Sequence, residues 1–167
     1  MCGFAGALAL GGGQAVDPAR LLDMREAMRH RGPDGEGLWL APDSRIGLAH
    51  RRLAIIDPVP ASAQPMGNQA GTVQLVFNGE IYNHALLRLE LMRCGHVFKT
   101  DHSDTEVLVH GYTQWGVDGL LQRLKGMFAI ALWDSERQQL FLLRDRLGIK
   151  PLYWTVSEGL LLFASEI

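Results

Sequence analysis

The chain has 167 residues, 47% of them hydrophobic and 20% charged, a composition typical of one globular domain with a buried core. Its 16 Lys and Arg against 18 Asp and Glu give a net charge of -2, which argues against nucleic acid or an anionic membrane as a partner. Two cysteines cannot form a disulfide framework, and no segment has the ~18–20 apolar residues of a membrane span. The apolar first ten residues lack the basic flank of a signal peptide, so we expect a cytoplasmic protein.

Short apolar or alternating runs predict most of the regular structure as strands. These runs cover residues 4–10, 37–41, 46–51, 53–56, 73–77, 96–100, 127–133, 139–144 and 160–164. A polar loop is expected over 58–71, and the polar residues 134–137 predict a hairpin between two of the strands.

Three helices are indicated by their first residues. Asp17 precedes Pro18, a typical helix start, and this helix should end before the turn at 31–35. Asn83 can cap a second helix that ends at Gly95, and the segment 103–106 resembles a capping box that opens a third helix. This third helix should reach residue 115, with a short helix near 117–124 after it. Because strands come in groups with few helices between them, we expect an antiparallel α+β fold rather than a βαβ Rossmann fold.

Other chemistry-bearing residues fit structural roles. Cys94 shares an apolar helical face with Leu87 and Leu91, which predicts a buried, inert thiol. Trp115, Trp133 and Trp154 are expected in the core. The six histidines show no metal-ligand spacing and no partnering cysteine pair, so no metal site is expected.

Cys2 is the first candidate for chemistry. Removal of Met1 would leave a cysteine at the amino terminus, which carries a nucleophilic thiol and a basic α-amine on one residue. Reference pKa values of about 8.5 for the thiol and about 7.7–8.0 for the amine make a neutral amine available near physiological pH. The alternative is that Cys2 merely follows the start codon.

Three further positions suit an acyl-transfer site, each with an ordinary alternative. Asn78 and Gly79 can supply a side-chain amide and a backbone N–H to an oxyanion, although Asn-Gly is also the commonest turn dipeptide. Arg52 can bind a carboxylate with two parallel hydrogen bonds. Asp104 can accept a hydrogen bond from an ammonium group or simply cap a helix.

The strings around these residues all fall in the order of one known family. They are CGFAG at 2–6, RHRGPDG at 29–35, HRRLAIID at 50–57, NGEIYN at 78–83, SDTE at 103–106, GMFA at 126–129, RDRLGIKPLY at 144–153 and FASEI at 163–167. Together they resemble the glutaminase domain of glutamine-hydrolysing asparagine synthetases, a class II glutamine amidotransferase, over essentially the whole chain.

The resemblance implies a role for each matching residue. Cys2 would attack the carboxamide of L-glutamine, with Asn78 and Gly79 holding the oxyanion. Arg52 would bind the α-carboxylate, Glu80 and Asp104 the α-ammonium, and the backbone of Leu53, Ala54, Ile55 and Ile56 would line the pocket. The implied fold is the four-layered αββα sandwich of N-terminal nucleophile hydrolases, and the implied domain covers residues 1–167.

The resemblance also implies what this chain lacks. The family's ATP-binding Ser-Gly-Gly-x-Asp-Ser loop is absent from the sequence, so we expect a fragment that is truncated at its C-terminal end and has no synthetase domain. ATP and Mg would belong to that domain, and the glutaminase domain itself would need no cofactor.

Several alternatives stay open from the sequence. One is a non-catalytic glutamine-binding module that serves regulation or assembly, although retained Cys2 favours the enzyme. Another is a different carboxylate acceptor in place of aspartate. The synthetase domain could be attached or separate, and a homodimer is a further open alternative.

Overall fold

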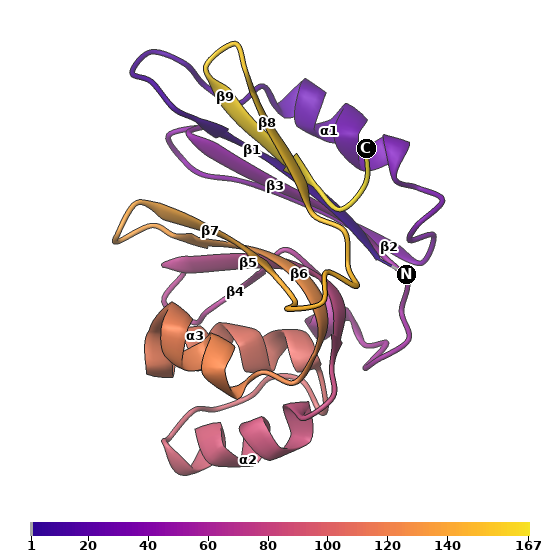
Figure 1. Ribbon diagram of the computed structural model, residues 1–167, viewed down its shortest axis with the longest axis vertical. Coiled ribbons are helices and arrows are strands. Elements are labelled where there is room, and N and C mark those ends of the chain that lie inside the picture. The colour runs from indigo at the N-terminus through magenta and orange to yellow at the C-terminus, as the bar shows by residue number, and fades with distance from the viewer. Residues whose placement is uncertain (1) are drawn as a thin grey trace.

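The computed structural model describes residues 2–167, so the predicted loss of Met1 concerns a residue outside the described part. It confirms the α+β sandwich: a helix, two facing antiparallel sheets and a second helical layer follow one another (Figure 1). The elements are β1 (Gly3–Ala9), α1 (Pro18–Ala27), β2 (Gly35–Leu40), β3 (Ile46–Arg52), a 3₁₀ turn (Pro60–Ser62), β4 (Met66–Gly67), β5 (Val73–Ile81), α2 (His84–Arg93), α3 (Asp104–Arg123), β6 (Gly126–Asp134), β7 (Gln139–Arg144), β8 (Tyr153–Ser157) and β9 (Leu160–Ala164).

The first sheet has the strand order β2-β3-β1-β9-β8, and the second has the order β4-β5-β6-β7. β1 is therefore a central strand, paired with β3 from Gly3 opposite Arg51 and with β9 from Ala5 opposite Ala164. Gly6 is required in β1 because a Cβ there would lie 2.2 Å from the ring of Phe163. This pairing fixes the position of Cys2, which directly precedes β1.

Side chains alternate along β6, so the second sheet packs against a hydrophobic core on each of its two faces. Ala129, Ala131 and Trp133 face the first sheet, whereas Phe128, Ile130 and Leu132 face the helices. Between the sheets they meet Phe4, Ile46, Leu48 and Phe163. On the other side, α3 contributes Val107, Leu108 and Tyr112, and α2 contributes Leu87 and Leu91. The site described below lies at one end of this double layer.

The helix starts follow the predictions only in part. Asp17 caps α1, since its Oδ1 accepts a hydrogen bond from Ala19 N at 2.9 Å. Asn83 and Ser103 hold the N-cap positions of α2 and α3 without a capping side-chain bond, so the predicted side-chain caps are wrong. The Asn83 side chain instead joins Arg123 O and Lys125 N, 40 or more residues away in the chain. The two predicted helices, 103–115 and 117–124, are both present within α3, and the break between them falls at Gly116, where the backbone is non-helical with φ 67°.

Two predicted strands are absent, and two strands were not predicted: β8 and the two-residue β4, which lies within the predicted loop 58–71. Residues 53–56 are not a strand because the Arg52 guanidinium binds carbonyls of Ile56, Asp57 and Val59 and turns the chain back. Residues 96–100 are not a strand because Lys99 and Thr100 donate their N–H groups to Glu106. The strand β8 was missed because all of its side chains are exposed, which leaves no alternating pattern.

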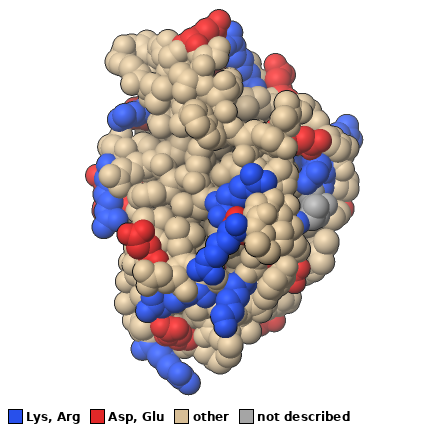
Figure 2. Space-filling model, viewed as in Figure 1, with Lys and Arg blue, Asp and Glu red and all other residues tan. Residues whose placement is uncertain are grey.

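Two core assignments were also wrong. Cys94 is exposed because it lies at the C-cap, past the last turn of α2, and Trp154 is 66% exposed on the edge strand β8. Trp133 is buried and Trp115 packs against the helical core, as predicted. Figure 2 shows few charged side chains over β8 and β9, and a group of Lys and Arg near the middle of the same face. None of the described helices has the length and apolarity needed to cross a membrane.

Candidate active site

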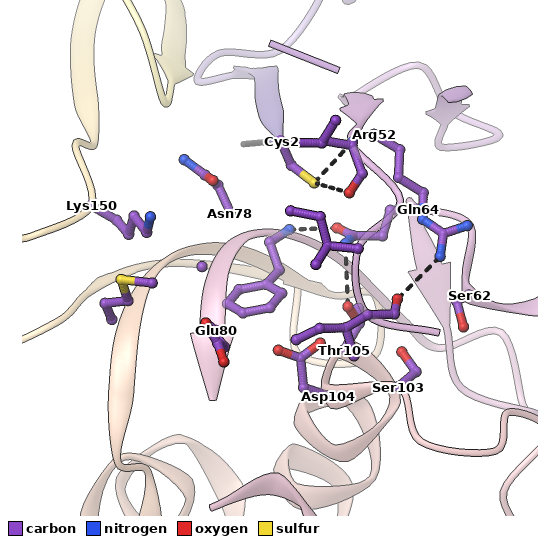
Figure 3. Close-up of a pocket in the computed structure, with 16 residues that line it drawn as sticks. Cys2, Arg52, Ser62, Gln64, Asn78, Glu80, Ser103, Asp104, Thr105 and Lys150 are labelled. Atoms are coloured by element: carbon purple, nitrogen blue, oxygen red, sulfur yellow. Dashed lines mark hydrogen bonds between the residues drawn. The ribbon is translucent and has the colours of Figure 1, made fainter. Parts of the chain in front are cut away.

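A cavity of about 260 Å³ lies where the start of β1, the end of β3, the end of β5 and the first turn of α3 meet. Its walls are formed by Cys2, Arg52, Leu53, Ile55, Ile56, Ser62, Gln64, Phe77, Asn78, Gly79, Glu80, Ser103, Asp104, Thr105, Met127 and Lys150 (Figure 3). The structure thus brings together every predicted site residue except Ala54. Ala54 lies outside the cavity wall, where its N–H donates to Asp34 Oδ2 at 2.9 Å.

Cys2 lies at the upper side of the cavity in Figure 3, between Asn78 on one side and Arg52 on the other. Its Sγ is 3.4 Å from Leu53 N, which donates a hydrogen bond to the sulfur, and 3.7 Å from Leu53 O. A backbone N–H that points at sulfur stabilises negative charge there. This contact holds the Cys2 thiol, just before β1, against the loop that follows β3.

Asn78 and Gly79 occupy β5, opposite Ala129 and Phe128 of β6. Asn78 is 1% exposed, and its Nδ2 has no hydrogen-bond partner among residues 2–167. A buried amide without a partner costs about 1–3 kcal/mol, so a ligand oxygen would satisfy an otherwise unfavourable group. Gly79 allows the strands to approach closely, because a Cβ there would lie 2.1 Å from Met127 O.

Arg52 forms the opposite side of the cavity from Asn78. Its Nη1 donates to Val59 O at 3.1 Å, and its Nη2 donates to Ile56 O at 3.5 Å and to Asp57 O. These contacts fix both the guanidinium and the loop that carries Leu53, Ile55 and Ile56. The side chain therefore presents a fixed cation with donors beside the cavity.

Glu80 and Asp104 supply two carboxylates at the lower side of the cavity in Figure 3. Asp104 is buried at the start of α3, and its Oδ2 accepts a hydrogen bond from Ile81 N at 3.2 Å. Burial raises the pKa of Asp104 above its usual value, against the lowering effects of the Ile81 N–H and of His84. A cation bound beside this carboxylate would relieve the cost of burying its charge.

His50 lies behind this wall and is excluded as a base near neutral pH. It is fully buried, with its Nε2 3.3 Å from Phe77 O, and burial lowers the pKa of His50 to about 3. The imidazole is therefore neutral, and Nε2–H donates to the carbonyl before Asn78. Within residues 2–167, no three His, Cys, Asp or Glu side chains gather as metal ligands would.

Sequence reasoning missed several residues of the cavity wall, above all Gln64 and Lys150. Gln64 Oε1 accepts a hydrogen bond from Phe77 N at 2.6 Å, and its Nε2 donates to Thr105 Oγ1 at 3.2 Å. It therefore ties β5 to the first turn of α3. Nothing in the polar loop 58–71 distinguishes Gln64 from its neighbours. Lys150 follows a turn after β7, and only the string RDRLGIKPLY could have pointed to it.

The sequence of this chain was compared with models of known protein families. The model of the glutamine amidotransferase domain matches residues 1–167, and the chain belongs to this family. The predicted class is therefore confirmed.

The curated relatives of this chain include asparagine synthetases. The chain is 43% identical over 169 residues to "Asparagine synthetase [glutamine-hydrolyzing] 2" of Bacillus subtilis (strain 168), covering 100% of this chain and 22% of that protein. It is 41% identical over 143 residues to "Amidase chry2" of Gibberella zeae, covering 85% of this chain and 21% of that protein. The chain thus spans less than a quarter of either relative.

A solved structure shares the fold. The glutamine phosphoribosylpyrophosphate amidotransferase of B. subtilis, complexed with ADP and GMP, superposes with a TM-score of 0.82 over 98% of this chain and 42% of that one. The two sequences are only 22% identical, so the similarity shows the fold alone.

Proposed function

We propose that this chain hydrolyses L-glutamine to L-glutamate and ammonia through a thioester on Cys2. The observation that carries the proposal is the buried, unpartnered amide of Asn78 in the same cavity as the Cys2 thiol. An open donor beside a nucleophile is the arrangement that acyl transfer requires.

The first half of the reaction forms the thioester. Once Met1 is removed, the neutral α-amine of Cys2 takes the proton from its thiol, and Sγ attacks the carboxamide carbon of glutamine. The carbonyl oxygen becomes an oxyanion that accepts hydrogen bonds from Asn78 Nδ2 and the Gly79 N–H. The C–N bond then breaks, the amine returns the proton to nitrogen, and ammonia leaves.

The second half regenerates the enzyme. Water loses a proton to the α-amine of Cys2 and attacks the thioester carbon, and the same two donors hold the new oxyanion. The C–S bond breaks, and Sγ recovers its proton as glutamate is released.

Recognition of glutamine would use the charged groups around the cavity. The Arg52 guanidinium binds the α-carboxylate, and the carboxylates of Glu80 and Asp104 bind the α-ammonium. Both charged ends of the substrate then meet an opposite charge, while the uncharged carboxamide reaches Cys2. Leu53, Ile55 and Ile56 bound the pocket between these ends, and Ala54 supports their loop from outside.

The ammonia would be used by a synthetase domain that lies outside residues 1–167, attached or separate. The names of the asparagine synthetase relatives support aspartate as the acceptor. ATP and Mg²⁺, which would activate that carboxylate, belong to the synthetase domain, and the glutaminase steps above use only this chain and water. We place the protein in the cytoplasm, where Cys2 stays reduced.

The test begins with a chain whose first residue is Cys2, verified by intact mass. Incubation with 6-diazo-5-oxo-L-norleucine, an electrophilic glutamine analogue, should add one label, and peptide mapping should place it on Cys2. Glutamine should slow the labelling and should itself be converted to glutamate and ammonia. Replacement of Cys2 by alanine should lower the rate of ammonia release by about 10⁴-fold or more.

The matched control is Cys94→Ala, since Cys94 is exposed at the end of α2 and is not among the residues that line the cavity. This variant should label and turn over like the unmodified chain. A folded chain that starts with Cys2 but takes up no label and releases no ammonia would contradict the proposal and favour a glutamine-binding module.

A further inference from the structure

Lys150 is a buried, positively charged residue of the cavity wall, and the reaction steps proposed above give it no role. Its side chain is 3% exposed, and it lines the same cavity as Cys2 and Asn78. Figure 3 shows Lys150 beside Asn78, on the side of Cys2 that lies away from Arg52. Lysine is almost never fully buried without a specific reason, because burial disfavours its charge.

The turn before Lys150 is held firmly. Asp145 is buried and accepts hydrogen bonds from Leu147 N at 3.2 Å, Ile149 N at 2.9 Å and Lys150 N at 2.9 Å. It also binds Phe128 N of β6 at 3.2 Å, which ties the turn to the second sheet. Burial raises the pKa of Asp145, but these backbone N–H groups outweigh burial and hold that pKa below its usual value.

Arg144 closes the same turn from its other side. Its Nε donates to Lys150 O and its Nη2 donates to Gly148 O, both at 2.7 Å. Gly148 has φ 64°, in the left-handed region that favours glycine. The backbone N–H of Lys150 is therefore bound by Asp145 and its carbonyl by Arg144. These contacts fix the position from which the Lys150 side chain extends along the cavity wall.

The charges that face Lys150 come from several elements. Burial lowers the pKa of Lys150, and the guanidinium of Arg31 acts in the same direction. Glu80 of β5, Asp145 and Cys2 oppose this effect and favour the ammonium. Cys2 and Lys150 therefore interact electrostatically within the cavity whose wall they share.

We propose that Lys150 is a positioning residue of the glutaminase site, whose buried ammonium stabilises the negative charge that develops on Cys2 Sγ. This inference rests on the proposed function. The proton still passes from Sγ to the α-amine of Cys2, and no bond to Lys150 forms or breaks. The ammonium favours the ionised sulfur before attack, together with the Leu53 N–H, which donates to Sγ.

The test measures the reactivity of Cys2 with iodoacetamide across pH, in chains that begin with Cys2. Iodoacetamide is small and uncharged, so its rate reports ionised sulfur without the glutamine pocket. Lys150→Met should move the pH of half-maximal alkylation upward by about one unit, and kcat for glutamine at pH 7 should fall roughly tenfold with a smaller change in KM. Lys150→Arg, which keeps the charge, should recover most of both losses.

The control is Arg146→Met, which removes an exposed positive charge from the same turn outside the cavity. Its alkylation profile should match that of the unmodified chain, because exposed charges are screened by salt and solvent. If Lys150→Met does not fold by circular dichroism, Lys150→Gln replaces it.

Two results would overturn the inference. One is an alkylation profile that stays in place in the folded neutral variants, and the other is a Lys150→Arg variant that behaves like Lys150→Met. Failure of the proposed function would look different, since the unmodified chain would then release no ammonia while its alkylation profile could still shift with Lys150.

Discussion

The two sides of the cavity are built differently. Cys2 directly precedes β1, which pairs with β3, and Asn78 and Gly79 lie on β5, which pairs with β6. The register of these strands therefore places all three residues. Arg52 and Asp104 lie where a strand or helix meets a loop. In the proposed reaction, the first group forms the reacting side of the cavity, and the second forms its recognition side.

The two sides also differ in their hydrogen bonds. On the recognition side, the Arg52 guanidinium already binds three loop carbonyls, and Asp104 accepts from Ile81 N. On the reacting side, Asn78 Nδ2 has no partner among the described residues. The Asn78 amide is thus available to donate a hydrogen bond where negative charge would develop in the proposed reaction. The recognition side, in contrast, is held in place before substrate binds.

Apart from replacement of Cys2 itself, the largest effect is expected when the donor on the reacting side is removed. Asn78→Ala should lower kcat for glutamine by about 10²–10³-fold and leave KM nearly unchanged, because the lost donor acts on the oxyanion rather than on bound substrate. Steady-state ammonia release measures both parameters. Labelling of Cys2 by iodoacetamide should stay normal in this variant. A rise in KM with unchanged kcat would instead assign Asn78 to substrate binding.

A smaller effect is expected when the recognition side is changed. Arg52→Lys keeps the charge but loses the forked donor geometry, so KM for glutamine should rise roughly 10- to 100-fold with little change in kcat. The matched substrate is 4-aminobutanamide, which lacks the α-carboxylate. The unmodified chain and the variant should hydrolyse it equally, and a variant equally impaired on both substrates would contradict this role for Arg52.

The smallest effect concerns the support of the recognition side. Glu106 accepts hydrogen bonds from Lys99 N at 2.7 Å and Thr100 N at 2.8 Å, in the loop that leads to Asp104. Burial raises the pKa of Glu106, but His110 and the Lys99 and Thr100 donors outweigh it and lower this pKa to about 2. The stability that ionised Glu106 contributes is therefore present above pH 4.5 and is lost as the pH falls from 4.5 toward 2.

Glu106→Gln should accordingly lower the free energy of unfolding by about 2 kcal/mol at pH 7, with the difference closing as the pH approaches 2. Urea titrations of both proteins across this range measure it. Buried His50, with its pKa of about 3, also costs stability as the pH falls below 6.5, but it does so in both proteins and cancels in the difference. A difference that is independent of pH would show that the Glu106 carboxylate contributes no charge-dependent stability.

The sequence alone determined the class, the antiparallel α+β sandwich and nine of the cavity residues by way of strings such as CGFAG and NGEIYN. Local patterns were sufficient for Asp17 as a helix cap and for the hairpin after β6, where Asp134 Oδ1 accepts from Glu136 N and Arg137 N. In these cases the deciding interactions join residues close in the chain, so propensity and pattern contain them.

The tertiary structure decided those features that depend on contacts between residues far apart in the chain. Residues 53–56 are a continuous apolar run typical of a buried strand, yet the contacts of Arg52 turn them into a loop. Glu106 accepts hydrogen bonds from Lys99 and Thr100, which precede its helix, and does not form a capping box. Lys150 and Gln64 join the Cys2 cavity only because β5, β6 and their turns bring them there. No local pattern marks such residues, because their energies depend on burial and on neighbours far away in the chain.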